Sequence, residues 1–274
     1  MQVSEGIHRM TQGVTNFYLI GESGKYTVVD AGTPGDWAYF ARSLAGLGAK
    51  LADVDAVLLT HAHPDHTGFA ERARTEAGAQ VWIHRADEQA ARTGQTGKRD
   101  GKVTSYLLRA AFYRTTVSLL RRGGGRMIPI AEVSAFDDGE QIDVPGRPRA
   151  VLAPGHTPGS AALLFEDRRV LVTGDVLATE NALTGRIGPQ IMPSGLNEDT
   201  DQALASLDTL LGIEADLLLP GHGDPWTQGV AEAVRRAKAA GRSLGSTSWC
   251  SYAPEGVPGP GNALSDLSPY GVSV

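Results

Sequence analysis

The chain has 274 residues, of which 41% are hydrophobic, so it can bury a large core in one large domain or two small ones. A formal net charge of −6 argues against a nucleic-acid-binding surface, which needs clustered cations, and no apolar run is long enough to span a membrane. The single cysteine, Cys250, excludes an internal disulfide and an all-cysteine zinc site. Because the N-terminus lacks a secretory signal, we expect a cytoplasmic protein that binds neither nucleic acid nor membrane.

The first part of the chain alternates predicted strands and helices. Apolar alternation and helical spacing predict, in order, strands at 15–20 and 26–29, a helix at 37–47, a strand at 53–59, a helix at 71–77 and a strand at 80–83. The first two strands form a hairpin that ends in Asp30, and the last strand ends in His84.

The strand at 53–59 leads into three histidines and an aspartate within six residues: His61, His63, Asp65 and His66. Imidazole and carboxylate groups are the usual ligands of Zn²⁺ when cysteine is absent. Residues two apart on extended backbone point the same way, so His61 and His63 can bind one ion while a turn directs Asp65 and His66 to another. A catalytic ion also keeps a position open for water, so the rest of the chain should supply at least two more ligands.

Residues 98–126 are different in character, with eight Lys and Arg and one acid, Asp100. Apolar residues recur at helical spacing, at Val103, Tyr106, Leu107, Ala110, Tyr113, Val117 and Leu120. We expect an amphipathic helix whose apolar side packs on the core. The alternative is an insertion that covers the substrate and prefers anions, with Gly123-Gly124-Gly125 leaving its end free to move.

The second part repeats the arrangement of the first, with apolar strands that end at His or Asp. A strand at 149–153 precedes His156, a hairpin of strands at 161–165 and 169–174 ends in Asp175, and a strand at 215–219 precedes His222. Groups carried on short Gly/Pro loops at strand ends are rigid and exposed, so we expect these loops to meet in one region. Helices are predicted at 199–211, with Asn197 as N-cap, and at 227–242.

The seven histidines divide into two groups. Five lie in the loops just described, and tight turns around His156 and His222 favour both as metal ligands. His8 and His84 have no second ligand-type neighbour, so we expect structural or surface roles. Ser160 follows a turn, but no histidine is left to activate it as a nucleophile.

Over residues 14 to about 225 these motifs resemble the metallo-β-lactamase-fold hydrolases, the superfamily that includes glyoxalase II. The resemblance implies an α/β (α+β) fold, a four-layer αββα sandwich of two similar halves with a two-metal site along one edge. It implies a catalytic domain at 1–245 that carries the insertion at 98–126, followed by a tail at 246–274 that is rich in Ser, Gly and Pro.

The resemblance also implies a role for each residue of the site. His61, His63 and His156 would bind the first metal; Asp65, His66 and His222 would bind the second; Asp175 would bridge the two, and Asp30 would support the loops. A bridging aspartate is unlike the true β-lactamases of this fold, so hydrolysis of antibiotics is a poor first guess.

The expected function is hydrolysis of a small ester, thioester or lactone by two Zn²⁺ ions, with Fe or Mn as other possible metals. Two ions about 3.5 Å apart lower the pKa of a shared water, so that a bridging hydroxide attacks the substrate. Asp65 could orient this water or carry its proton. Alternatives are an iron oxidoreductase such as a persulfide dioxygenase, with its second site empty, a phosphodiesterase, and a binding protein without turnover.

The partner that we expect is a small-molecule substrate, for which the cationic segment favours an acid. Candidate residues for its pocket come from residues 98–126 and 180–194, and they are Tyr106, Arg109, Tyr113, Arg186 and Met192.

Overall fold

The computed structural model of the protein describes residues 1–242. The predicted tail at 246–274 and Cys250 lie outside the described residues. No helix within residues 1–242 is both long and apolar enough to cross a bilayer.

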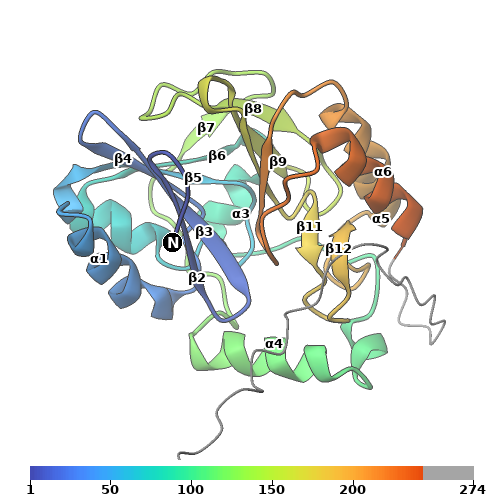
Figure 1. The fold of residues 1–274 in the computed structure, drawn as a ribbon. Coiled ribbons are helices and arrows are strands. Elements are labelled where there is room, and N and C mark those ends of the chain that lie inside the picture. Colours follow the sequence, from blue (N-terminus) through green and yellow to red (C-terminus); the bar gives the residue numbers. More distant parts are fainter. Residues whose placement is uncertain (243–274) are drawn as a thin grey trace, which may run out of the picture.

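The first half of the chain builds a seven-stranded sheet whose strands lie side by side in chain order (Figure 1). Its strands are β1 (Gln2–Ser4), β2 (Ile7–Gln12), β3 (Thr15–Glu22), β4 (Lys25–Val29), β5 (Val54–Leu59), β6 (Gln80–His84) and β7 (Ser134–Phe136). Neighbours from β1 to β4 are antiparallel, and neighbours from β4 to β7 are parallel. The strand pair β1–β2, which the sequence analysis did not predict, extends the antiparallel edge.

The second half builds a four-stranded sheet of order β13-β10-β9-β8 and a separate two-stranded hairpin. The strands are β8 (Arg149–Leu152), β9 (Ala161–Phe165), β10 (Val170–Gly174) and β13 (Leu217–Pro220), and the hairpin is β11 (Ala178–Glu180) with β12 (Ile187–Gln190). Strands β10 and β13 are parallel, so the loops that follow them, which carry Asp175 and His222, emerge at the same end of the sheet.

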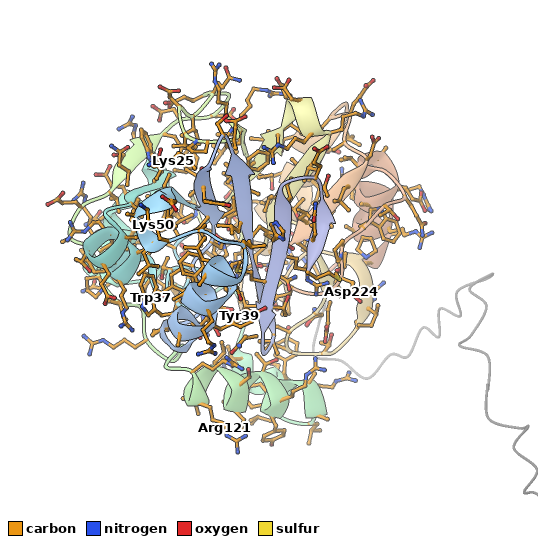
Figure 2. All side chains as sticks on the ribbon, turned by 60° about the vertical axis from the view of Figure 1, so that its left-hand side comes forward. Lys25, Trp37, Tyr39, Lys50, Arg121 and Asp224 are labelled. Carbon is orange, nitrogen blue, oxygen red and sulfur yellow. The ribbon has the colours of Figure 1, made fainter. Side chains whose placement is uncertain are left out.

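The helices lie on the outer faces of the two sheets, apart from α4, which runs along the lower rim (Figure 1). They are α1 (Trp37–Gly46), α2 (Ala70–Arg72), α3 (Glu88–Thr93), α4 (Ala110–Arg121), α5 (Thr200–Ser206) and α6 (Val230–Ala240). Figure 2, turned by 60°, brings α1 to the front with Trp37 and Tyr39 on it.

Strands with apolar residues on both faces explain the layers. In β3, Tyr18 and Ile20 belong to the core between the sheets, whereas Leu19 belongs to the core under the helices of the first half. Strand β10 does the same, with Val172 between the sheets and Leu171 under α5 and α6. A strand buried on both faces reads as a continuous apolar run, which is how these strands appear in the sequence. The predicted αββα sandwich is confirmed.

The helix predicted at 199–211 is shorter and begins later. Helix α5 starts after Asp199, whose carboxylate accepts a hydrogen bond from the Gln202 amide at 2.9 Å, and it gives way to a 3₁₀ turn at Leu207–Leu210. The prediction of Asn197 as the N-cap is therefore wrong. The Asn197 side chain instead accepts a hydrogen bond from His156 Nδ1 at 2.9 Å and donates one to the Met192 carbonyl oxygen at 2.8 Å.

The prediction that the apolar side of 98–126 packs on the core is wrong for α4. Tyr113, Val117 and Leu120 are 54%, 44% and 66% exposed, whereas Thr115 on the opposite face is buried. Polar groups hold the helix to the body instead. Thr115 Oγ1 donates to the carbonyl oxygen of Ala182, and Arg122, just after α4, donates to Asp36 at 2.8 Å. Helix α4 thus packs on the body through polar contacts and exposes its apolar face to solvent.

Candidate metal centre

Both sheets deliver the predicted ligands to one edge. His61, His63, Asp65 and His66 follow β5 of the seven-stranded sheet, and His156, Asp175 and His222 follow β8, β10 and β13 of the four-stranded sheet. All are buried except Asp65, which is half-buried. Residues more than 160 positions apart in sequence thus meet in a single buried site.

Three groups of ligand atoms lie within 4.8 Å of one another among the described residues. They are His61, His63 and His156; His61, His66 and Asp175; and Asp65, His66 and His222. The first and third groups are the two sets that the sequence analysis predicted.

Asp175 lies between the two sets. Its carboxylate oxygens are 3.3 Å from His156 Nε2, 3.5 Å from His66 Nε2 and 3.4 Å from His222 Nε2. One carboxylate therefore faces members of both sets, as a bridging ligand must.

The far side of four imidazoles is held by another group. His66 Nδ1 donates to Asp30 Oδ2 at 2.8 Å, His156 Nδ1 to Asn197 Oδ1 at 2.9 Å, and His222 Nδ1 to the Val14 carbonyl oxygen at 2.7 Å; His61 Nδ1 lies 3.0 Å from Thr60 Oγ1. These contacts fix each ring and leave Nε2 toward the cluster, which is how proteins orient metal-binding histidines.

The donor set fits a pair of metal ions. His66 Nε2 and Asp175 Oδ1 are fully buried and have no hydrogen-bond partner within the described part of the chain. A buried polar atom without a partner costs free energy, so such an atom indicates that the site binds a further group, such as a metal ion. Both atoms point into the cluster, where imidazole nitrogen and carboxylate oxygen suit Zn²⁺ or a similar ion.

The electrostatics of the two sets are opposite. Burial, with neighbouring imidazoles, lowers the pKa of His61 well below its ordinary value and that of His63 to about 3. Burial acts in the same direction on His66 and His222, but nearby carboxylates, Asp175 above all, outweigh it and raise the pKa of His66 to about 10 and that of His222. His61 and His63 are therefore neutral at pH 7, whereas an ion that binds at His66 would displace a proton.

Asp30, for which the resemblance implies a supporting role, contacts the loop after β5 at two points. It follows β4 with a φ of 61°, a left-handed conformation that aspartate tolerates better than most residues. From there its Oδ1 accepts a hydrogen bond from the Thr60 amide at 2.8 Å while Oδ2 holds His66. One buried carboxylate thus fixes the start of the ligand loop and one of its imidazoles.

Asp87 is a positioning residue that the sequence analysis missed. This carboxylate, 1% exposed, accepts hydrogen bonds from the Ala62 amide at 2.8 Å, Thr157 Oγ1 at 2.7 Å and the Gly159 amide at 2.7 Å. It therefore ties the loop after β5 to the loop after β8. Nothing in its local sequence sets it apart from an exposed aspartate at a helix start.

Two glycines let the loops approach each other. A Cβ atom at Gly221 would lie 2.3 Å from Asp175 Oδ1, and one at Gly174, whose φ is 49°, would lie 2.5 Å from Thr60 Oγ1. Neither position has room for a side chain, so the close meeting of the two halves depends on glycine here.

The remaining polar candidates have structural contacts. His84 Nδ1 accepts a hydrogen bond from the Ala86 amide at 3.2 Å, and the His84 ring lies edge-on to Phe136. His8 lies within β2, opposite Leu19. Ser160 is 1% exposed, and its hydroxyl accepts from the Thr157 amide at 2.9 Å. None of the three belongs to the ligand groups of the described residues.

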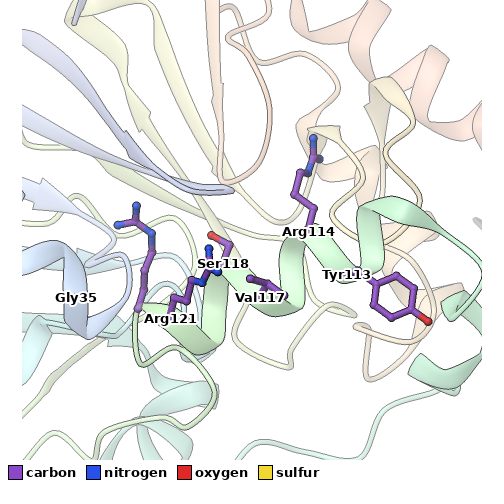
Figure 3. Close-up of a pocket in the computed structure, with 7 residues that line it drawn as sticks. Gly35, Tyr113, Arg114, Val117, Ser118 and Arg121 are labelled. Atoms are coloured by element: carbon purple, nitrogen blue, oxygen red, sulfur yellow. The ribbon is translucent and has the colours of Figure 1, made fainter.

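Two cavities adjoin α4, and the smaller one is nearer the metal edge. The larger, of about 720 Å³, is lined by Gly35, Tyr113, Arg114, Val117, Ser118, Arg121 and Arg122 (Figure 3). The smaller, of about 200 Å³, shares Arg114 and Ser118 with it and reaches Val14 and Gly223, which flank the position of His222. The two cavities therefore lie next to each other along α4, and neither is lined by a predicted metal ligand.

The five candidate substrate residues fall in different environments. Tyr106 and Met192 are each 1% exposed and fill packing sites, Tyr106 beside Ser194 and Met192 beside Ala178 and Ala182. Arg109 is half-buried at the start of α4, and Arg186 is exposed on the turn between β11 and β12. Of the five, only Tyr113 lines one of the two cavities.

Comparison with known proteins places the chain in a family. A profile of the metallo-beta-lactamase superfamily matches residues 10–222. The probable metallo-hydrolase YflN of Bacillus subtilis (strain 168) is 30% identical over 239 residues, which span 82% of this chain and 87% of that protein. The thioesterase pkgB of Emericella nidulans is 26% identical over 216 residues, which span 77% of this chain and 46% of that protein.

Solved structures agree. A metallo-beta-lactamase family protein from Thermus thermophilus superimposes with a TM-score of 0.64 at 26% identity, covering 87% of this chain and 80% of that one. The sandwich, the ligand groups at its edge and these matches lead to one conclusion: the chain belongs to the metallo-beta-lactamase superfamily.

Proposed function

We propose that this protein is a dinuclear zinc hydrolase of a small ester, thioester or lactone. The observation that carries the proposal is the pair of adjacent ligand sets with Asp175 between them. His61, His63 and His156 would hold one ion and Asp65, His66 and His222 the other. Metal pairs of this kind, when bound, make water a nucleophile at neutral pH and stabilise the charge that develops on a carbonyl oxygen.

The chain's own residues contribute orientation and proton handling. Asp65 is the ligand with the greatest access to solvent, its side chain 16% exposed, and Thr15 Oγ1 donates to its Oδ2 at 3.0 Å. We infer that this carboxylate orients the attacking water or accepts its proton. Asp30 and Asn197 keep the imidazoles in place, so little rearrangement is needed when substrate arrives.

Among these three substrate classes, one relative favours thioesters. The similar protein pkgB is named a thioesterase, and the match to it spans most of the present chain. A thioester carbonyl is an acyl centre of the kind that water attacks at such a site, so we place thioesters first in a substrate panel.

Two measurements test the proposal. Metal content of the purified full-length chain should approach two zinc ions, and hydrolysis should appear in a panel of thioesters, esters and lactones. Chelation should abolish hydrolysis, and zinc should restore it. Full activity in metal-free protein would refute the proposal.

An iron oxidoreductase of the persulfide dioxygenase type is the main alternative, and the second ligand set argues against it. Such an enzyme would leave Asp65, His66 and His222 unused, yet these three groups converge within 4.8 Å. One iron per chain together with oxygen uptake would favour the alternative over the hydrolase.

The position of Arg114 supports a preference for acidic substrates. Arg114 lines both cavities and pairs with Glu180, whose backbone amide donates to the carbonyl oxygen of His222 at 3.2 Å. We expect Arg114→Ala to raise KM for substrates with a free carboxylate and to leave KM for their methyl esters unchanged. Arg42→Ala, an exposed arginine on α1, is the matched control. An unchanged KM for every acidic substrate would remove the preference.

A further inference from the structure

The segment at 98–126 has the opposite charge from the rest of the chain. It carries eight Lys and Arg against one Asp, whereas the remaining residues carry 17 Lys and Arg against 30 Asp and Glu. A segment this basic within an acidic protein favours contact with an anionic surface.

The same segment gathers exposed apolar side chains. Ten large hydrophobic residues are exposed within residues 1–242, and five of them lie between 107 and 120. We call four of these the outer stripe: Leu108, which is 95% exposed just before α4, and Tyr113, Val117 and Leu120 on the helix. Figure 3 shows the Tyr113 ring directed away from the sheets while Arg114 points toward them. Apolar residues at positions i, i+4 and i+7 make one continuous face of a helix.

The outer stripe does not arise from a loosely placed helix. Three contacts fasten α4 to both halves of the molecule: Arg114 with Glu180, Thr115 with Ala182, and Arg122 with Asp36. The inner face is therefore already occupied, and the apolar face remains outward while these contacts hold.

A second copy of the chain is a poor partner for this face. Pairing of α4 with the same helix of a copy would bring two segments of the same strongly positive charge together, and these repel each other. Pairing with another face would need an apolar patch there, but the other five exposed hydrophobics are scattered over the described residues, at Met1, Leu47, Ile128, Ile187 and Leu211.

Contrary to the expectation of no membrane contact, which came from the chain as a whole, we propose that the outer stripe and the basic residues around it dock on an anionic phospholipid bilayer, with α4 lying in the plane of the surface. Leucine, tyrosine and valine would enter the boundary between head groups and acyl chains, and the surrounding Arg and Lys would stay at the phosphate level. Arg121 is placed for this role, since Figure 2 shows it at the outer edge of α4 and no ion pair engages it within residues 1–242.

Docking in this orientation would bring the metal edge close to the lipid surface. Arg114 and Ser118 of α4 line the small cavity together with Val14 and Gly223, next to His222. The docking inference itself stands independently of the proposed hydrolysis.

Vesicle sedimentation of the full-length chain tests the inference. We expect binding to vesicles of phosphatidylcholine with phosphatidylglycerol, little binding to phosphatidylcholine alone, and weaker binding as salt rises. The double variant Leu108→Gln with Leu120→Gln should lower the partition coefficient about tenfold or more, because two exposed apolar side chains no longer enter the boundary. Leu211→Gln, a 49% exposed leucine outside the segment, is the matched control and should bind like the unchanged chain.

A variant that removes one positive charge tests the electrostatic part of vesicle binding separately from the apolar substitutions. Arg121→Gln should weaken binding to the anionic vesicles about fivefold. Circular dichroism and the unfolding temperature of each variant verify that the fold is retained. Absence of binding to the anionic vesicles, or binding that the double variant leaves unchanged, would overturn the inference. So would a dimer that the double variant dissociates in sedimentation velocity, since the stripe would then serve a second copy.

Discussion

The metal edge and helix α4 lie next to each other but are built in opposite ways. At the metal edge, imidazoles and carboxylates are buried, and groups such as Asp30, Asp87 and Asn197 hold them in place. On α4, apolar side chains are exposed and polar ones attach the helix to the body. In both places the usual distribution of polar and apolar residues is reversed. The comparison teaches that buried polar groups require hydrogen-bond partners or a metal ion, whereas a contiguous group of exposed apolar side chains marks an interaction surface.

The largest expected effect comes from removing the carboxylate that faces both ligand sets. Asp175→Asn should lower kcat/KM for a thioester by about 10³-fold or more, beyond the 10- to 100-fold cost of losing a group that only orients a ligand. Steady-state kinetics and metal content measure the effect. Asp216→Asn, an exposed carboxylate paired with Arg169, is the control and should retain activity. Equal activity in both variants would show that Asp175 takes no part in the site.

Loss of an orienting group should have an intermediate effect. Asn197→Ala frees His156 Nδ1, so metal affinity should fall about 10- to 100-fold, as judged by competition with a chromophoric chelator. Asn197→Asp keeps an oxygen acceptor for the imidazole and should recover much of the affinity. If alanine and aspartate behaved alike, the hydrogen bond to His156 would not be the cause.

The two ligand sets should respond differently to pH. In the metal-free protein, the pKa of His66, raised to about 10, keeps a proton on that imidazole at pH 7, and the pKa of His222 is raised as well, whereas the lowered pKa values of His61 and His63 leave these two imidazoles neutral. Binding of the second ion should therefore release more protons and weaken more as pH falls, by about tenfold per pH unit for each proton displaced. Calorimetric titration in buffers of different ionisation enthalpy counts these protons. Equal proton release for both ions would contradict the electrostatic difference.

The smallest expected effect is on the free energy of unfolding, and it distinguishes the two faces of α4 by substitution of two neighbouring leucines. Leu119 is half-buried beside Gly124, whereas Leu120 is 66% exposed. Leu119→Ala should lower the free energy of unfolding by about 1–2 kcal/mol, and Leu120→Ala by less than about 0.5 kcal/mol. Chemical denaturation of the two variants measures the difference. A larger loss for Leu120 would mean that the outer stripe packs against the protein.

The architecture could be predicted from the sequence, and the candidate ligands could be located within it, because apolar runs bounded by turns are local features. Apolar runs bounded by turns located strands such as β5 and β10, and each predicted ligand follows one of these runs within a few residues. The resemblance to a known family then assigned the residues to two sets, and the structure brings His156, Asp175 and His222 to the residues after β5.

The supporting residues and the orientation of α4 could not be predicted, because they depend on contacts between distant segments. Asp87 serves the site only because β6 ends beside the loop after β5, and Asn197 only because its loop passes the His156 ring. The apolar stripe of α4 had the spacing of a core helix, yet the contacts of Thr115 and Arg122 fix the opposite face inward. Periodicity shows that a helix has two faces, but not which one the fold will cover.

Each ligand set draws its members from both sheets, and this has a consequence for the lifetime of the folded chain. An ion held by His61, His63 and His156 would fasten the seven-stranded sheet to the four-stranded one, and a second ion held by Asp65, His66 and His222 would do so again. Because a ligand that binds only the folded chain stabilises it, loss of the metal would weaken the contact between the two halves as well as abolish activity. The supply of metal would then govern how long the protein survives proteolysis as much as how fast it works.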